Sequence, residues 1–348
     1  MHPRRNIAVI GSGVAGLTAA YVLAKHDRVT LYERDSRLGG HAHTHEVEFA
    51  PGKRVWVDSG FLVHNDRTYP TLLRLFEELG VQTRETDMSM SVRADALGLE
   101  YAGAKGLGGL FSTARMLRKP RYLRMLTEIR RFHRAARELL RQDDSALTLA
   151  EFLREHRFSA YFTEYFMTPL VAAVWSCDPG TATQYPAQYL FRFLDHHGML
   201  TVYDSPTWRT VVGGSARYVE KIATTLDEVR TGTPVLAVAE HTDHVLVTDR
   251  SGVRRFDAAV LATHPQQALA LLADPSPLTE AVLGAMPYSL NPAQLPEIDS
   301  GRVTFAGAYH GWGFHEDGAL SGLRAAERLG GWWPVYLTGK AADAVGAR

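Results

Sequence analysis

The feature that most constrains this chain is a Gly-x-Gly-x-x-Gly turn near its N-terminus. Four apolar residues, 7–10, precede the turn, and residues 17–24 continue with helix-like spacing, so the sequence predicts a strand, a tight turn and a helix. Backbone exposed at such glycines can approach a pyrophosphate, and the helix N-terminus offers free N–H groups to its phosphates. The pattern predicts a dinucleotide site at Gly11, Ser12, Gly13, Val14, Ala15 and Gly16.

A second predicted strand, residues 29–32, ends in an acidic residue at the position that a dinucleotide site requires. Glu33 lies 22 positions after Gly11. An acidic side chain there accepts the hydroxyl groups of the adenosine ribose. The flanking strand, the helix and Glu33 together argue against an accidental glycine loop.

Composition excludes several other classes of protein. The 348 residues are enough for two domains. The 38 basic residues balance the 38 acidic ones, so the overall charge does not indicate a nucleic acid or an acidic substrate as partner. The single cysteine, Cys177, excludes an internal disulfide framework and fits a reducing compartment, so we expect a cytoplasmic protein. His41, His43 and His45 alternate but have no acidic partner at a suitable spacing, so we expect no metal site.

The segment after Glu33 narrows the expected ligand. It reads Arg34-Asp35-Ser36-Arg37-Leu38-Gly39-Gly40-His41. Here the chain resembles the flavin amine oxidase, phytoene desaturase and protoporphyrinogen oxidase superfamily, the flavoproteins with two dinucleotide-binding domains. It is most similar to a bacterial branch of predicted NAD/FAD-binding oxidoreductases. The resemblance implies non-covalent FAD, held in part by Glu33, Arg34, Gly39, Gly40 and His41, where His41 stands in the usual place of arginine.

Two later segments extend this resemblance. A strand pattern beginning near Val235 resembles the second flavin segment, where the backbone at this position contacts the adenine. Residues 303–307 and the glycine-containing stretch after them resemble the third, which implies contacts from Gly307, Asp317, Gly318 and Ala319. We expect a helix that opens at Gly318 and aims its N–H groups at the flavin. Ala308 departs from the glutamate that the family usually has there.

The same resemblance suggests residues for catalysis. Trp312 matches a commonly aromatic position, and His315 takes the place of one wall of the aromatic cage of amine oxidases. His315 is therefore our candidate for a residue that faces the substrate over the flavin. A structural histidine that only holds the loop is the alternative.

These features predict an α/β protein of two domains. We expect a Rossmann-like FAD-binding domain of the glutathione-reductase-2 type, assembled from three segments, 1–69, 205–270 and 300–335. A mixed α+β, largely helical substrate domain would comprise 70–204 and 271–299. Only 37 residues separate Pro265 from Val303, where relatives carry several strands and a helix of the substrate domain. We therefore expect an open, impaired site or one completed by another subunit of a homo-oligomer.

Residues 115–141 form an unusually basic region, with ten Lys or Arg against two Glu. A solvated helix face explains this charge, and so does peripheral contact with the inner face of an anionic membrane. No interleaved aromatic platform accompanies the charge, so we do not expect nucleic acid.

Three functions remain open at this point. The first is an FAD-dependent oxidoreductase that transfers a hydride from a substrate C–H bond to flavin N5, with an amine or a lipid-like molecule as substrate and dioxygen as an electron acceptor. The second is an FAD-binding protein without turnover. The third, an NAD(P)-dependent dehydrogenase, leaves Gly39, Gly40 and Gly318 unexplained.

Overall fold

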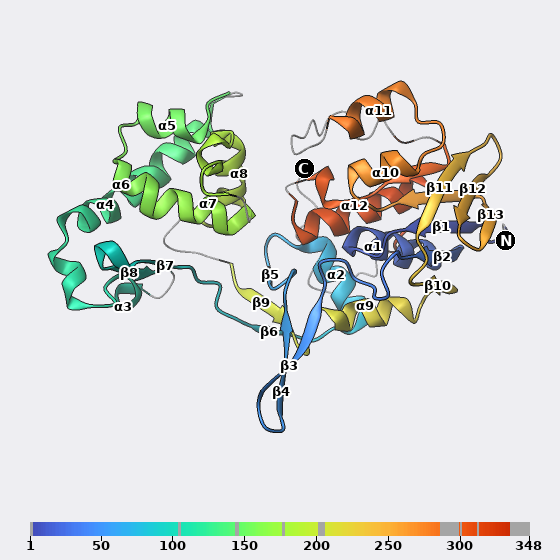
Figure 1. The fold of residues 1–348 in the computed structure, drawn as a ribbon, viewed down its shortest axis with the longest axis horizontal. Helices are drawn as coiled ribbons and strands as arrows, with labels where there is room; N and C mark the ends of the chain where they lie inside the picture. Colours follow the sequence, from blue (N-terminus) through green and yellow to red (C-terminus); the bar gives the residue numbers. More distant parts are fainter. Residues whose placement is uncertain are drawn as a thin grey trace. The chain divides into compact units, whose positions relative to one another are not determined.

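The computed structural model describes residues 3–103, 106–142, 146–175, 178–200, 206–285, 299, 301–311 and 313–334. The chain divides into two compact units (Figure 1). Unit 1 comprises Met1–Leu62, Tyr69–Arg84 and Thr210–Arg348, and unit 2 comprises Val63–Thr68 and Glu85–Arg209.

A five-stranded parallel sheet forms the centre of unit 1. Its order is β10 (Glu228–Arg230), β2 (Arg28–Tyr32), β1 (Asn6–Ile10), β14 (Ala258–Leu261) and β15 (Val303–Phe305). Strands from distant parts of the sequence are thus neighbours, and β1 pairs with both β2 and β14. The predicted α/β class with a parallel sheet is confirmed.

Two layers cover this sheet. On one face of the sheet, Ala8 and Ile10 lie in a hydrophobic core with residues of three strands and two helices. These elements are β11 (Val235–Glu240), β12 (Val245–Asp249), β13 (Gly252–Phe256), α10 (Pro265–Leu271) and α11 (Pro277–Gly284). Alternate strand residues point to opposite faces, so Ile7 and Val9 face the other layer. That layer contains α1 (Val14–Ala24) and α12 (His315–Arg328), which pack side by side (Figure 1).

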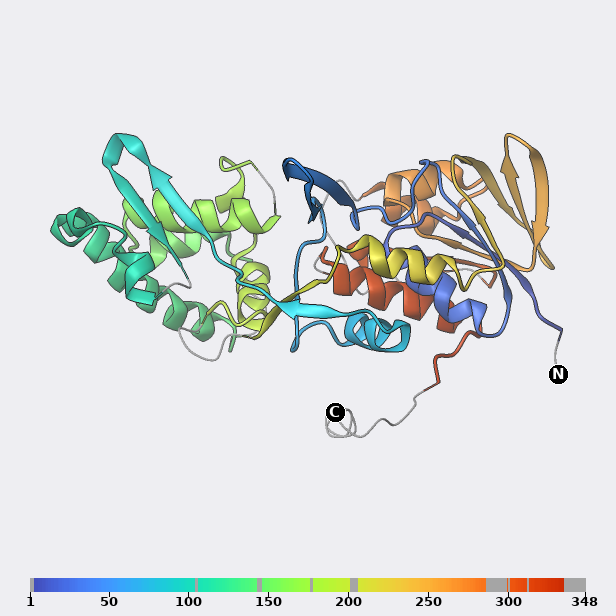
Figure 2. The ribbon, with the colours of Figure 1, turned by 90° about the horizontal axis from the view of Figure 1, so that it is seen from below.

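The remaining elements of unit 1 lie around this sandwich. Helices α2 (Pro70–Leu79) and α9 (Ala216–Ala223) pack on each other, and β3 (Thr44–Ala50) and β4 (Lys53–Asp58) form a hairpin that Figure 2 shows in dark blue. The short 3-10 helix η6 (Ala308–His310) follows β15. The chain passes between the units at β6 (Thr83–Glu85) and β9 (Trp208–Val211).

Unit 2 is mainly helical. Its helices are α3 (Gly106–Leu110), η2 (Ala114–Arg118), α4 (Pro120–Leu139), α5 (Leu149–Glu155), α6 (Ala160–Phe162), the π-helix η3 (Thr163–Met167), α7 (Thr168–Trp175), η4 (Ala182–Gln184) and α8 (Ala187–His196). Its strands are β5 (His64–Asn65), β7 (Ser91–Ala94) and β8 (Leu99–Ala102), with η1 (Asp95–Leu97) between the last two. Buried aromatic rings, including Phe132, Phe152 and Phe191, fill its core.

This division differs from the expected domain ranges in several places, and one is residues 63–68, which were expected in the FAD-binding domain and belong to unit 2. The α2 segment was expected in the substrate domain, but α2 packs against α12 and belongs to unit 1. The same holds for α11, whose Leu283 is buried in the core beneath the central sheet. Both helices have an apolar face, and sequence periodicity shows that such a face is buried without showing what covers it.

Helix α5 begins with a reciprocal cap. Glu151 N–H donates to Thr148 Oγ1 at 3.3 Å, while Thr148 N–H donates to Glu151 Oε2 at 2.9 Å. We expect Thr148→Ala to lower the free energy of unfolding of unit 2 by about 1 kcal/mol, because an N–H group of the first turn loses its acceptor. Urea unfolding measures this. Thr127→Ala, on the exposed face of α4, is the matched control, and an equal loss in both variants would contradict the prediction.

Candidate functional site

The glycine turn joins β1 to α1, and its three glycines meet different surroundings. Gly11 has φ +102°, and a Cβ there would overlap the carbonyl oxygen of Ala262. A Cβ at Gly16 would overlap the carbonyl oxygen of Gly11. In contrast, a Cβ at Gly13 would meet nothing within 4 Å. The fold itself therefore requires Gly11 and Gly16, whereas Gly13 leaves space at the N-terminus of α1.

The carboxylate of Glu33 faces this turn. Ser12 N–H donates to Oε2 at 3.0 Å, and the Ser12 hydroxyl donates to the same oxygen. Asp35 N–H donates to Oε1 at 2.9 Å. A carboxylate offers about four acceptor positions, so Oε1 keeps one for a further hydroxyl group. Arg34 is exposed and pairs with Asp35 at 3.4 Å.

The predicted Gly39–His41 loop packs directly on the glycine turn. Gly39 N–H lies 3.0 Å from the Ser12 carbonyl oxygen and 3.1 Å from its hydroxyl oxygen. Gly40 has φ +56°, and a Cβ there would lie 3.0 Å from Gly13 Cα. The loop therefore needs glycine in order to reach the turn. The backbone brings His41 to the same place, with its side chain exposed.

Backbone hydrogen bonds bring the segment before Val235 to the same edge of the sheet. Glu33 N–H donates to Arg230 O at 2.9 Å, and Thr233 N–H donates to Glu33 O at 2.9 Å. Val235, partly buried, then begins β11. The predicted first and second segments thus meet beside Glu33.

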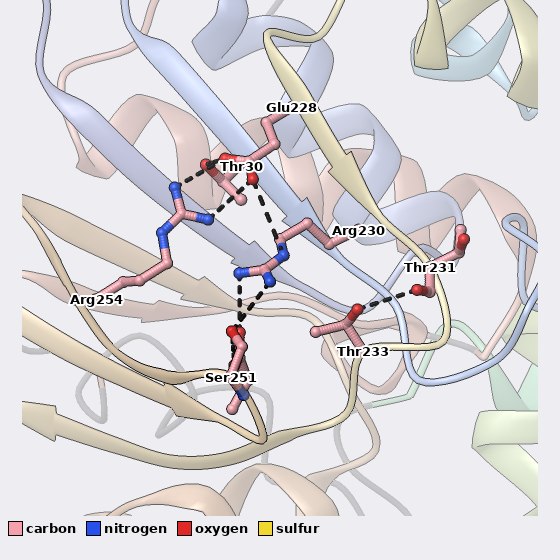
Figure 3. Close-up of polar contacts among 8 residues, drawn as sticks. Thr30, Glu228, Arg230, Thr231, Thr233, Ser251 and Arg254 are labelled. Carbon is pink, nitrogen blue, oxygen red and sulfur yellow. Dashed lines mark hydrogen bonds and ion pairs between the residues drawn. The ribbon is translucent and has the colours of Figure 1, made fainter.

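A polar network that the sequence did not indicate fixes this edge (Figure 3). Arg254 contacts both carboxylate oxygens of Glu228, at 3.0 and 2.8 Å, and the Thr30 hydroxyl donates to Glu228 at 3.0 Å. Arg230 Nη1 pairs with Asp249 at 2.9 Å. The hydrogen bonds from Arg254 lower the pKa of Glu228. Strands β2, β10, β12 and β13 are therefore tied together around the second segment.

The third predicted segment lies against the first. Gly307 N–H donates to the Ser321 hydroxyl at 3.0 Å. A Cβ at Gly318 would overlap Val14, and one at Gly322 would overlap the Ala15 carbonyl oxygen, so α12 and α1 are in close contact. Ala319, in the same turn as Gly318, is fully buried.

The start of α12 corrects one expectation. The helix begins at His315 instead of Gly318, because Asp317 accepts the N–H of Phe314 at 2.9 Å and caps the first turn. Gly318 therefore lies inside the helix and serves its packing on α1. Asp317 stabilises the helix N-terminus rather than standing free in a loop.

His315 is held between two side chains of unit 1. Its ring stacks on Phe61 with centroids 3.7 Å apart and planes 9° apart. Its Nε2 lies 2.6 Å from the Tyr218 hydroxyl oxygen. Burial raises the pKa of Tyr218 far above its usual value, so the phenol keeps its proton beside Nε2. The other candidate catalytic residue, Trp312, lies outside the described residues.

Glu316, next to His315, is a site residue that the sequence analysis missed. Its carboxylate accepts the N–H groups of Thr71 and Leu72, at 2.8 and 2.9 Å, in the first turn of α2. Burial raises its pKa to about 7, even though both donors favour the charged form. No sequence signal pointed to it, because the predicted helix opened after it, at Gly318, and nothing local identifies α2 as its partner.

The described part of the chain has neither a metal-binding cluster nor a membrane-spanning helix. It holds no group of three or more His, Cys, Asp or Glu side chains arranged to bind a metal ion. None of its helices has the length and apolar character needed to span a bilayer.

Comparison with known proteins identifies related sequences. Residues 14–291, most of the chain, match the model of a family described as flavin containing amine oxidoreductase. A carotenoid phi-ring synthase of Streptomyces griseus is 39% identical over 85 residues, which are 23% of this chain and 16% of that protein. A tryptophan 2-monooxygenase of Agrobacterium vitis is 46% identical over 52 residues, 14% of this chain and 7% of that protein.

Solved structures share the fold at low sequence identity. A putrescine oxidase bound to putrescine superposes with a TM-score of 0.61 at 17% identity, covering 81% of this chain and 63% of that one. The cyclohexylamine oxidase of Brevibacterium oxydans IH-35A gives a TM-score of 0.65 at 16% identity, covering 93% and 98%. The chain thus spans less than two thirds of the putrescine oxidase.

Proposed function

Because the chain belongs to the family of flavin-containing amine oxidoreductases, we propose that it is an oxidoreductase that binds FAD non-covalently and oxidises a C–H bond of a small molecule. The cofactor of this family is FAD. When bound, it supplies the hydride acceptor at N5. Every other role proposed below belongs to residues of this chain.

The observation that carries the proposal is the open space at Gly13. It lies at the N-terminus of α1, beside the Gly39–Gly40 loop, and Glu33 keeps an acceptor position nearby. We infer that Gly11–Gly16, Gly39, Gly40 and His41 hold the pyrophosphate, and that Glu33 and Arg34 hold the ribose. Val235 would contact the adenine. Three separated segments would thus form one cofactor site.

The chemical end of the site would lie near the first turn of α12. Gly307, Asp317, Gly318 and Ala319 place this helix against α1, and its N-terminal N–H groups suit a developing negative charge on the reduced flavin. His315 would face the substrate. Trp312, outside the described residues, remains a candidate from its sequence position.

We propose an amine or a lipid-like molecule as substrate and dioxygen as the electron acceptor. Family membership supports the amine, and the apolar, aromatic sequence of residues 161–175 favours a lipid-like molecule. An FAD-binding protein without turnover is the second candidate function. The observation that favours it is the short stretch of 37 residues between Pro265 and Val303, where relatives carry part of the substrate domain.

Spectroscopy of the purified protein tests the first proposal. We expect a flavin absorption spectrum in the protein as isolated or after addition of FAD. Anaerobic mixing with a series of primary amines and long-chain aliphatic amines should bleach this spectrum, because substrate oxidation reduces the flavin. A colourless protein that takes up no FAD would overturn the proposal, and bound flavin that no substrate reduces would favour the binding protein.

A variant of His315 separates its two roles. If His315 faces the substrate, His315→Asn keeps FAD bound while the anaerobic bleaching rate falls by about 10-fold or more. A histidine that only braces the loop would instead show lower thermal stability with an unchanged bleaching rate. Tyr218→Phe removes the hydroxyl partner and serves as the matched control for the loop contact.

A further inference from the structure

One face of α4 in unit 2 carries a row of arginines that the flavin site does not explain. Arg124, Arg130, Arg131, Arg134 and Arg137 of α4, and Arg141 just after its last residue, are all exposed, and at about 3.6 residues per turn they fall within less than half of the helix circumference. We call these six residues the arginine face. The opposite side of α4 is buried through Tyr122, Met125, Phe132, Ala136 and Leu139. Of these arginines Arg131 also packs on the protein itself, because its guanidinium lies 4.2 Å from the centre of the Phe158 ring and donates to Arg157 O at 3.1 Å.

Acidic groups neutralise only part of this face. Glu128 lies 3.7 Å from Arg124 and 3.6 Å from Arg131, but its oxygens also accept the N–H and hydroxyl groups of Ser159, at 3.0 and 2.6 Å. Glu138 pairs with Arg141 at 2.7 Å. Arg130 and Arg134 have no ion pair within the part of the chain that the structure describes. Among the residues that the structure describes, two carboxylates pair with these six arginines.

Exposed leucines lie on the elements that lead into this helix. Leu107 of α3 is 75% exposed, Leu117 of η2 is 57% exposed, and Leu123 in the first turn of α4 is 37% exposed. Arg118, Lys119 and Arg121 lie among them in the sequence. Exposed large aliphatic side chains that are close in the sequence to basic residues are typical of segments that rest at a lipid–water interface.

We propose that the arginine face, with Leu107, Leu117 and Leu123, docks on a bilayer that contains anionic phospholipid. The arginines match the negative lipid headgroups, each basic residue near such a surface contributing about fivefold in affinity. The leucines bury apolar surface at the boundary of the acyl chains. The contact is independent of the flavin site and would bring the enzyme to lipid-like substrates.

Vesicle co-sedimentation of the full chain tests this inference. We expect binding to phosphatidylcholine vesicles that contain about one third phosphatidylglycerol, no binding to pure phosphatidylcholine, and loss of binding as salt rises. Arg130→Gln with Arg134→Gln should weaken binding about 20-fold or more. The matched control is Arg28→Gln with Arg250→Gln, which removes the same charge from exposed sites of unit 1 and should leave binding unchanged.

Leu117→Ser distinguishes a membrane from a soluble polyanion. It should weaken vesicle binding and leave the salt dependence unchanged, because only the apolar contribution is lost. Equal binding to neutral and anionic vesicles, or an equal loss in both double variants, would overturn the proposal. Binding to a polynucleotide that exceeds vesicle binding and is insensitive to Leu117→Ser would overturn it in favour of nucleic acid. Unchanged FAD content in each variant shows that the flavin site is intact.

Discussion

Replacing Gly13 with aspartate should abolish FAD binding while the FAD-free protein stays folded. Gly13 is the N-cap of α1, with φ −63° and ψ 173°, a conformation that any residue adopts, and a Cβ there meets nothing within 4 Å. Aspartate is also a favourable N-cap, so we expect a free energy of unfolding within about 1 kcal/mol of wild type. The new carboxylate fills the phosphate position and repels it, so the dissociation constant of FAD should rise at least about 100-fold.

Two further variants make this result specific. Gly13→Asn has the same shape without the charge, so the difference between the two variants measures repulsion alone. Gly301→Asp adds the same charge where a Cβ also meets nothing within 4 Å, and it should leave FAD binding unchanged. Titration with FAD, followed by fluorescence, gives the dissociation constant of FAD. Urea unfolding of the FAD-free protein gives its free energy of unfolding. Wild-type affinity in Gly13→Asp would show that α1 does not hold the phosphates.

The sequence predicted those parts of the site that depend on backbone conformation. Gly11, Gly16 and Gly40 occupy positions where the chain turns sharply or two segments touch, and only glycine fits there. Glu33 was predictable because the helix α1 and the strand β2 together fix its distance from the turn. Local constraints of this kind leave a record in residue type, which explains why a nucleotide site could be predicted at this turn without a structure.

The proposed substrate end of the site, around His315, depends on contacts between segments that are distant in the sequence. Phe61, Tyr218 and His315 come from three separate parts of the chain, and no local pattern predicts that their rings meet. The start of α12 was misplaced for a similar reason, since the cap that Asp317 provides depends on a loop conformation. Glu316 bonds to residues 245 and 244 positions away, so its role was beyond sequence reasoning.

Substitution of Glu316 with glutamine should remove a pH dependence from the stability of unit 1. Burial raises the pKa of this carboxyl from 4.5 to about 7 in the folded protein. Between these two pH values the folded chain binds more protons than the unfolded chain. The contribution of the Glu316 carboxyl to the free energy of unfolding is therefore complete below pH 4.5 and is lost as pH rises through about 7. The wild type should therefore lose about 2 to 3 kcal/mol relative to Glu316→Gln over this range.

Urea unfolding of both proteins at several pH values measures this difference, and other titrating groups cancel in the comparison. Glu327→Gln, an exposed glutamate on the same helix, is the matched control and should follow the wild-type curve. Parallel curves for wild type and Glu316→Gln would mean that the N–H groups of Thr71 and Leu72 offset the cost of burying the charge. A diverging curve would show that α2 and the first turn of α12 are held together by a carboxyl group that prefers to keep its proton, beside the histidine proposed to face the substrate.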